Sequence, residues 1–520
     1  MIGRRLFQLK NSLPDLTPVG LRRRQVLRGA LLAPLAPTAS LAQAQRAPDL
    51  IARENRNAGA ADWQLTNVRL DKSRGFRSPL IEGYCSHQSV EAGETLRIMV
   101  STNPPARFEI EFFRMGYYGG RGARRMTSLG PFSGKTQPDP PVGENRLREC
   151  RWEPSAELKI PAGWPSGVYL GRLKTLPASE NVHAWQSYII FILKDRRPAD
   201  ILFQCSDNTW QAYNRWPDDY SLYTDPRHPW APNVAVSFDR PYGKYPQIYE
   251  HPLSVGSGEF LLWEFPLCYW LEMHGYDVTY CGNADMLNPE EALRAKVFIS
   301  PGHDEYWDLR QYGNAMAAIK AGVTALFLSG NSVYGVTPFS PSGDGRPNRV
   351  ITRVGRYGGV SQREAELFFK IPYPMEGPDE ALLMGAATPY PFNGGGDWVI
   401  TMPDHWMFAG TGVKKGERIP GLVGWEFHAD PAPIPGLEVV AEGVALRGGT
   451  DPVRWTATIY PGPKGNFVFN ASTIWWAQGL SSPPGHILPW AHWVRPHGPD
   501  PRVQRITENL LRQALGNKAG

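Results

Sequence analysis

Cysteine is scarce in this chain, and its scarcity excludes a disulfide-rich scaffold. Only five of the 520 residues are cysteine, and none of them belongs to a Cys-x-x-Cys pair. Small disulfide-dense domains carry far more cysteine per residue. The odd number leaves at least one free thiol, and a bridge between Cys85 and Cys150 stays open at this point. The other three cysteines lie in apolar runs and are expected to be buried thiols.

An excess of charge and long hydrophobic runs are missing too. The formal net charge is only +5, which argues against nucleic acid as a partner. After the N-terminal leader, no segment approaches the ~20 apolar residues of a membrane-spanning helix. The chain is 42% hydrophobic and 12% aromatic, which is sufficient for a large core, and its length suggests two or three domains.

Several catalytic motifs are also absent. The sequence contains no Gly-x-Ser-x-Gly nucleophile elbow, no His-Glu-x-x-His zinc motif and no phosphate-binding P-loop. The turn at Pro301 and Gly302 carries no serine or cysteine nucleophile. These absences argue against a hydrolase that works through a covalent acyl-enzyme.

The N-terminus has the features of an export signal. Residues 22–24 are three arginines, an apolar segment follows to about residue 39, and small-x-small sites lie at residues 40–42 and 42–44. This order is typical of a signal peptide, and the paired arginines favour the twin-arginine route. We expect residues 1–44 to be the signal and the mature protein to be periplasmic or secreted. The alternative is a basic amphipathic helix that stays attached.

From residue 61 to residue 196 the hydrophobic pattern has a period of two. Apolar residues alternate with polar neighbours in two clear examples, Leu96, Ile98 and Val100, and Phe108, Ile110 and Phe112. Short runs of this kind, separated by proline and glycine turns without a convincing helix, are typical of a β-sandwich. We therefore predict a β-sandwich domain over residues 61–196.

After residue 197 apolar runs alternate with helical patterns. Strands are predicted at residues 201–205, 277–281, 296–300, 323–329 and 467–470, and helices at residues 260–274, 289–295, 309–321 and 500–515. Continuous apolar strands separated by helices indicate a parallel sheet with helices on both faces. We predict an α/β domain over residues 197–515, with an irregular insertion at residues 340–400, which are rich in glycine, proline and aromatic residues.

Polar and aromatic residues follow the predicted strands. Asn208 and Trp210 come after the first strand, Asn331 after the fourth and Trp475 after the last. Ligands of open α/β sheets bind at the carboxyl ends of the strands, so we predict that these four residues bind substrate. For any single strand end, ordinary loop chemistry is the competing interpretation.

A contiguous group of reactive side chains follows the third strand. His303, Asp304 and Glu305 can move protons, and we predict that they are catalytic. The phenolate of Tyr306 is a hard oxygen ligand that suits an oxidised metal such as Fe(III). The alternative is that Asp304 or Glu305 caps the helix that begins near residue 309, with Tyr306 as a packing residue.

These residues also resemble a known family. The segment 302–307, Gly-His-Asp-Glu-Tyr-Trp, resembles the signature of the large (beta) subunit of N,N-dimethylformamidase and its relatives. Four further segments fit the same family in matching order, at residues 113–120, 164–171, 263–266 and 472–480. The likeness runs from about residue 80 to the C-terminus.

The resemblance implies a fold, a metal and a partner. The fold is a lectin-like or immunoglobulin-like β domain followed by a domain similar to class I glutamine amidotransferases. The metal is a mononuclear iron held by two tyrosines and one glutamate. Tyr306 stands where one tyrosine belongs, whereas the other position falls at Phe265, which cannot bind metal. The glutamate is left open among Glu376, Glu380 and Glu426, and a small partner subunit is implied.

The function expected from this sequence is hydrolysis. We predict an exported enzyme that cleaves a C–N amide bond of a small molecule, with Glu305 or His303 as the base and Tyr306 as a metal ligand or oxyanion donor. A metal-free hydrolase is one alternative. Another is a non-catalytic periplasmic protein that binds a carbohydrate or other ligand. A homo-oligomer is as compatible with the sequence as a small partner subunit.

Overall fold

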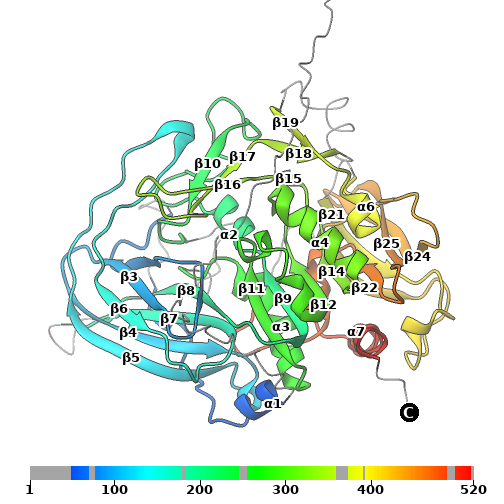
Figure 1. Ribbon diagram of the computed structural model, residues 1–520, viewed down its shortest axis with the longest axis horizontal. Coiled ribbons are helices and arrows are strands. Elements are labelled where there is room, and N and C mark those ends of the chain that lie inside the picture. Colours follow the sequence, from blue (N-terminus) through cyan, green and yellow to red (C-terminus); the bar gives the residue numbers. More distant parts are fainter. Residues whose placement is uncertain are drawn as a thin grey trace, which may run out of the picture. The chain divides into compact units, whose positions relative to one another are not determined.

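Strands dominate the structure, and they gather in two regions of the chain (Figure 1). The computed structural model describes residues 49–68, 76–177, 183–244, 255–358, 373–389, 393–488 and 498–516. The predicted signal peptide, residues 1–44, lies outside this part of the chain. The described residues all belong to one compact unit that spans residues 44–520.

The first region, drawn in blue and cyan at the left of Figure 1, consists of two sheets. One sheet has the order β1 (Glu82–Cys85), β3 (Thr95–Ser101), β6 (Ala156–Lys159). The other has the order β2 (Ser89–Glu91), β8 (Gln186–Lys194), β7 (Gly167–Thr175), β4 (Arg107–Met115), β5 (Ala123–Ser133). Apolar side chains of both sheets, such as Ile98 and Phe112, share one core. Strands are found where the period-two pattern predicts them, although β7 and β8 are buried along almost their whole length. The specific β-sandwich fold stays a prediction.

The second region is built on a sheet of nine strands. Its order is β11 (Val278–Gly282), β9 (Ala199–Cys205), β12 (Ala295–Gly302), β14 (Thr324–Ser329), β26 (Phe467–Asn470), β25 (Asp451–Pro461), β24 (Glu438–Arg447), β21 (Asn393–Val399), β22 (Arg418–Glu426). The first five strands run parallel, as predicted, and the remaining pairs are antiparallel. The molecule is therefore a mixed α/β protein, whereas the amidotransferase-like fold stays a prediction.

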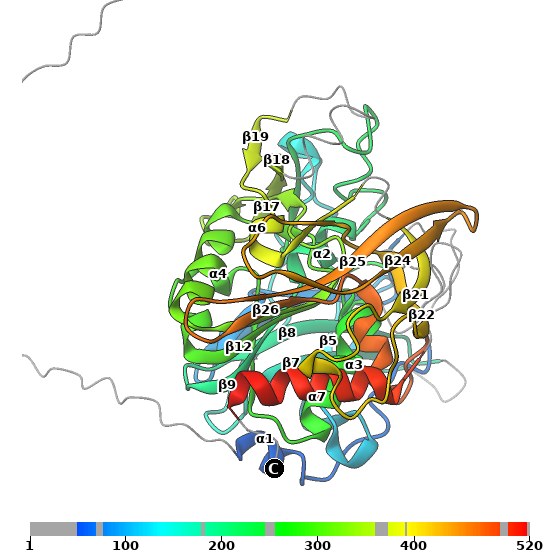
Figure 2. The same cartoon turned by 90° about the vertical axis from the view of Figure 1, so that its right-hand side faces the viewer.

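Helices cover both faces of the parallel strands (Figure 2). Ile299 of β12 packs in one core cluster with residues of α3 (Phe265–Met273) and α7 (Pro501–Leu515). Its neighbour Phe298 packs in another cluster with residues of α4 (Leu309–Ala321). Successive side chains of a strand point to opposite faces, and a sheet buried on both faces requires continuous apolar strands.

The predicted helices differ in how well they match. Residues 260–274 form a π-helical turn (Phe260–Glu264) followed by α3, and Gly275 follows the helix with a φ of +70°, as a C-terminal glycine should. The helix predicted at residues 289–295 is wrong, because only Ala292–Arg294 form a 3-10 turn. So short a segment gains little from helix formation, and Arg294 instead donates to the Arg197 carbonyl oxygen at 3.3 Å.

Residues 340–400 contribute to several sheets. β16 (Phe339–Ser340) and β17 (Val350–Arg353) pair with β10 (Val234–Ser237) in a small sheet. A second small sheet has the order β13 (Tyr306–Trp307), β15 (Gly335–Val336), β18 (Gly355–Tyr357), β19 (Met375–Gly377). β21 belongs to the nine-stranded sheet itself. These described strands place part of the predicted insertion in the main fold.

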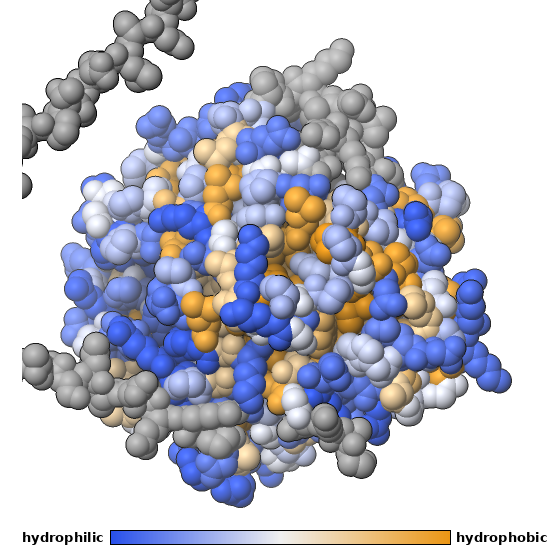
Figure 3. Space-filling view, turned by 45° about the vertical axis from the view of Figure 1, so that its right-hand side comes forward, coloured by the Kyte–Doolittle hydropathy of each residue, from blue (hydrophilic) through white to orange (hydrophobic). Residues whose placement is uncertain are grey.

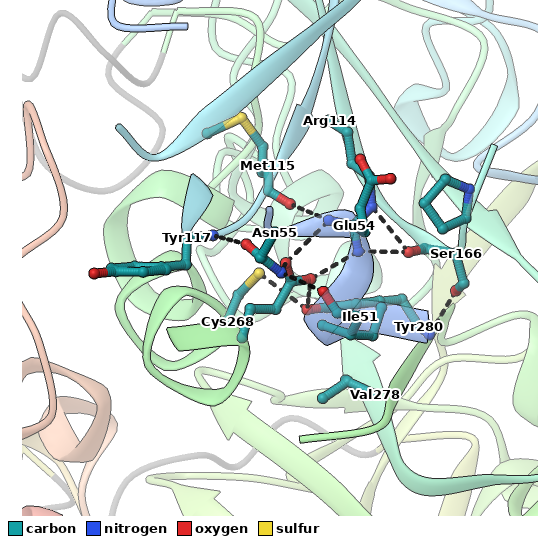
Figure 4. A network of polar contacts seen from close by, with 12 residues as sticks. Ile51, Glu54, Asn55, Arg114, Met115, Tyr117, Ser166, Cys268, Val278 and Tyr280 are labelled. Carbon is teal, nitrogen blue, oxygen red and sulfur yellow. Dashed lines mark hydrogen bonds and ion pairs between the residues drawn. The ribbon is translucent and has the colours of Figure 1, made fainter. Parts of the chain in front are cut away.

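Buried polar contacts tie the first region to the second (Figure 4). Arg114 of β4 donates to both carboxylate oxygens of Glu272 in α3, at 2.8 and 3.0 Å, and neither side chain is exposed. Glu272 also accepts hydrogen bonds from Asn55 and Tyr280, each at 2.9 Å. All five cysteines are buried and free, so Cys85 and Cys150 form no bridge.

Polar and apolar residues share the surface shown in Figure 3. Large apolar side chains that reach solvent are spread along the chain, for example Val142 and Val444. Among the described residues, no helix is both long and apolar enough to cross a membrane.

Candidate active site

The order of the strands creates a crevice beside β9. The chain passes from β9 to β11 on one side of it and then to β12 on the other side. At such a switch the segments that follow the two strands separate, and ligands of open α/β sheets bind there. α2 (Asp207–Tyr213) follows β9, and residues 303–306 follow β12. The predicted catalytic cluster therefore lies at the expected position of the sheet.

His303 lies between two carboxylates in this crevice. Its Nε2 atom is 2.7 Å from Oε2 of Glu426 and 3.2 Å from Oε2 of Glu305. Glu426 is the last residue of β22, which is the edge strand of the large sheet opposite β11. The three residues are at most 4% exposed, so their charges interact with little screening by water.

Two tyrosine hydroxyls contact Glu305, and a third contacts one of these two. Tyr213, the last residue of α2, donates to Oε2 at 2.8 Å, and Tyr223 donates to Oε1 at 2.7 Å. The hydroxyls of Tyr223 and Tyr306 are also in direct hydrogen-bond contact. Tyr213 and Tyr223 were not predicted as site residues, because their segment shows no regular hydrophobic period.

Burial and neighbouring charge set the protonation of these groups. Burial, together with the nearby Glu305 carboxylate, raises the pKa of Tyr213, Tyr223 and Tyr306 well above that of free tyrosine. The three phenols are therefore neutral. Burial would lower the pKa of His303, but Glu426 and Glu305 outweigh it and raise that pKa well above its ordinary value. His303 is therefore an imidazolium at neutral pH.

Asp304 is directed away from these groups into a set of donors. Its carboxylate accepts hydrogen bonds from Gln204, from Asn283 at 3.0 Å and from Ser300 at 2.8 Å. Its carbonyl oxygen accepts the N–H of Val333 at 3.0 Å. Val333 has a φ of +53°, a conformation that is costly for a β-branched residue. Asp304 thus holds the loop after β14 in place.

The capping interpretation of Asp304 and Glu305 is wrong. The N-cap of α4 is Asp308, whose side chain accepts the N–H of Arg310 at 2.8 Å. Glu305 faces the tyrosine hydroxyls instead.

Two of the four predicted substrate-binding residues touch the cluster. Asn331 donates to Oε2 of Glu426 at 3.2 Å, and Asn208 donates to the carbonyl oxygen of Tyr306 at 2.9 Å. Trp210 instead donates to Glu264 at 2.8 Å and packs in the main core. Trp475 is fully buried in a cluster of aromatic and aliphatic residues, of which Trp425 lies near His303 with ring centroids 5.8 Å apart. The structure thus separates the two asparagines from the two tryptophans.

The comparison with protein families found a match that covers most of the chain. The model of the family described as N,N-dimethylformamidase beta subunit-like, C-terminal, matches residues 109–488. The chain belongs to the N,N-dimethylformamidase beta subunit-like family. The matched range contains the described residues of the cluster, from Tyr213 to Glu426.

The other two comparisons add little. The search of curated proteins found no match. Among solved structures, a family 123 glycoside hydrolase from Clostridium perfringens shares 9% identity with a TM-score of 0.11. That alignment covers 26% of this chain and 32% of the other, and so weak a likeness carries no argument about fold or function.

The position at which the family resemblance implies a second tyrosine lies outside the cluster. Phe265 is 1% exposed and packs against Trp63 and Phe260, with ring centroids 5.8 and 5.7 Å away. Phenylalanine at this position therefore leaves the cluster unchanged. The second hydroxyl beside Tyr306 comes from Tyr223. Of the three glutamates left open by the sequence, Glu426 is the one that contacts His303.

The oxygen atoms of this site fit a hard metal ion. Tyr223 contacts both Glu305 and Tyr306, so the three residues bring together two phenol oxygens and a carboxylate. Hard oxygen donors suit an oxidised metal such as Fe(III). Among the described residues, no group of three or more histidine, cysteine, aspartate and glutamate side chains is arranged as a metal site. The set here differs from such groups because two of its members are tyrosines.

Proposed function

We propose that this protein is an exported hydrolase that cleaves the C–N bond of a small amide. The observation that carries the proposal is the position of His303 between Glu305 and Glu426, beside tyrosine hydroxyls at the switch point of the sheet. Such a group can donate a proton to a leaving nitrogen at neutral pH. Membership in the N,N-dimethylformamidase beta subunit-like family supports the same reaction class.

We propose that Tyr223, Tyr306 and Glu305 hold iron. When bound, the metal would polarise the carbonyl group of the amide and so assist attack by water. In this assignment Glu305 is a ligand, and the role of base, which the sequence suggested for it, passes to Glu426. The buried, neutral phenols would lose their protons on binding a cation, because the metal charge compensates the phenolates.

His303 and Glu426 carry out the proton transfers of the reaction. Water adds to the carbonyl carbon and gives one proton to Glu426. The C–N bond then breaks as His303 donates its proton to the departing nitrogen, which leaves as an amine. Glu426 returns its proton to His303 across the 2.7 Å contact, so the products are a carboxylic acid and an amine. Asn331 orients Glu426 throughout by its hydrogen bond of 3.2 Å.

A neutral histidine, His428, holds the loop that carries Asn331. His428 is fully buried, and burial lowers its pKa to about 4. Its Nδ1 contacts the side-chain oxygen of Asn470 at 3.1 Å, and its Nε2 accepts the N–H of Ser332 at 3.1 Å. These contacts fix the loop that carries Asn331 and therefore position Glu426.

The metal assignment predicts which tyrosines matter. Tyr223→Phe and Tyr306→Phe should each reduce iron in the purified protein at least tenfold, whereas Glu426→Gln should retain it and lose turnover. Elemental analysis and amine release measured on the same samples test this. Tyr460→Phe is the control, because its hydroxyl donates to the Leu383 carbonyl oxygen in another part of the molecule. Iron retained in Tyr223→Phe would contradict the ligand set.

The proposed location rests on the arginine-rich leader. Fractionation of cells that express the full chain, with and without lysine at residues 22–24, tests it. Periplasmic protein that depends on the arginines supports twin-arginine export, and cytoplasmic retention of the natural chain would contradict it.

A further inference from the structure

Arg353 is a buried cation beside the proposed active site. It is the last residue of β17 and only 1% exposed. Its guanidinium carbon lies 5.3 Å from the ring centroid of Tyr223 and 5.8 Å from that of Trp230. Because Tyr223 also donates to Glu305, one aromatic ring separates this positive charge from the carboxylate of the cluster.

Most of the hydrogen-bonding capacity of Arg353 is unused. A guanidinium carries five N–H groups. Nη2 donates to the carbonyl oxygens of Pro229 and Ala231, at 2.9 and 2.8 Å. Nε and Nη1 are buried, and neither has a hydrogen-bond partner among the described residues. No carboxylate in that part of the chain forms an ion pair with Arg353 either.

Two other buried arginines of this chain have partners for more of their hydrogen-bond donors. Arg114 makes two hydrogen bonds to Glu272, so its charge is neutralised. Arg240, also 1% exposed, has no carboxylate partner but donates from Nε, Nη1 and Nη2 to side-chain and backbone oxygens. A buried charge without partners is costly, and Arg353 alone among these three keeps donors free at the edge of a proposed active site.

The residues between Arg353 and the proposed active site differ in exposure. His303 and Tyr306 are fully buried, while Tyr213, Tyr223 and Trp230 are only partly buried. The aromatic residues therefore form the side of the site that contacts solvent. Of these residues, Tyr223 and Trp230 are the two whose rings lie against the Arg353 guanidinium.

We propose that Arg353 binds a carboxylate of the substrate, so that the enzyme prefers amides that carry a negative charge close to the scissile bond. This inference rests on the proposed amide hydrolysis and adds the substrate class to it. Guanidinium–carboxylate hydrogen bonds are short and charge-assisted, and a rigid cation selects an anionic ligand over a neutral one of the same shape. N-acyl amino acids have this chemistry, whereas dialkyl formamides lack the charge.

A matched pair of substrates tests the proposal. N-formylglycine carries the carboxylate, and N-(2-hydroxyethyl)formamide replaces it by a neutral hydroxymethyl group. Formate release by the iron-loaded protein should give a kcat/KM at least tenfold higher for N-formylglycine. Arg353→Gln should lose at least tenfold on N-formylglycine, mainly through KM, and change less than threefold on the neutral substrate. Gln retains a donor for the two carbonyl oxygens, so the fold is expected to survive.

Two further variants separate charge from structure. Arg353→Lys keeps the positive charge and should retain part of the preference for N-formylglycine. Arg454→Gln removes a surface arginine whose side chain is 57% exposed and should leave both substrates unaffected. Equal kcat/KM for the two substrates in the natural protein, or an unchanged preference in Arg353→Gln, would overturn the proposal.

Ligand binding distinguishes failure of this inference from failure of the proposed hydrolysis. N-acetylglycine should raise the melting temperature of the natural protein and of Arg353→Lys, but not of Arg353→Gln. If neither formamide is hydrolysed and this stabilisation is still seen, the anion site holds and the amidase assignment fails. If N-acetylglycine does not stabilise the natural protein, the anion site is wrong whatever the turnover.

Discussion

One buried carboxyl group makes the stability of the protein depend on pH. Glu264 is fully buried, and burial raises its pKa to about 8 despite hydrogen bonds from Ser206 and Trp210. Its ordinary value is near 4.5. Between these two pH values the native state holds a proton that the unfolded chain has lost, so the free energy of unfolding falls as pH rises through this window.

Glu264→Gln should therefore flatten the pH dependence of stability. The amide keeps an oxygen acceptor and does not titrate. The natural protein should lose up to about 1.4 kcal/mol per pH unit from this group between pH 5 and 8, and the variant should be the more stable of the two at pH 8. Urea unfolding at pH 5 and pH 8 measures this. Glu157→Gln, at a side chain 63% exposed, is the control, and identical slopes for Glu264→Gln and the natural protein would refute the argument.

Residues next to each other in sequence were the part of the site that could be predicted. His303, Glu305 and Tyr306 stand together after one strand, so their proximity follows from local order alone. Glu426 arrives from the far edge of the sheet and Tyr223 from an irregular loop. Their approach depends on topology, which a hydrophobic pattern does not encode.

Helix ends show the same dependence at the scale of elements. Asp304, Glu305 and Asp308 all precede α4, and Asp308 is the cap because it directly precedes the first residue of the helix. Asp304 and Glu305 are separated from the helix by β13 and form hydrogen bonds in the crevice. The apolar parallel strands could be predicted from continuous burial. The antiparallel strands β24 and β25 were missed because parts of both reach solvent, which weakens the pattern.

Removing either helix cap should have a moderate effect on stability. Asp308→Ala and the matched Asp500→Ala at α7 each delete a side chain that accepts a backbone N–H at 2.8 Å. Each should cost about 1 kcal/mol of unfolding free energy. Chemical denaturation measures both variants. Asp308 also accepts the N–H of Phe339 at 3.1 Å, which adds to the loss expected for Asp308→Ala. A stability equal to that of the natural protein in either variant would contradict the capping assignment.

At the scale of the whole molecule, the Arg114–Glu272 pair links a strand of the first region to a helix of the second. Glu272→Gln would leave the Arg114 guanidinium buried without a counter-charge, and we expect a loss of about 3–5 kcal/mol. A double-mutant cycle with Arg114→Met should show a coupling above about 1 kcal/mol. Glu442→Gln, which breaks a surface pair with Arg454, should cost less than about 1 kcal/mol.

The loss expected for Glu272→Gln also tests how the two regions cooperate. A single unfolding transition shifted to lower denaturant would show that the regions unfold together. Two separated transitions, or no change in stability, would contradict a shared, buried linkage.

The whole account depends on one pair of groups. The decisive measurement compares amine and carboxylate release from small amides by the natural protein and by His303→Gln, with iron determined on the same samples. The account predicts equimolar products from the natural protein, and a loss of at least 100-fold in kcat for His303→Gln with iron content and melting temperature retained. Turnover that is unchanged in His303→Gln, or an iron-loaded natural protein that releases no amine from any amide tested, would contradict it.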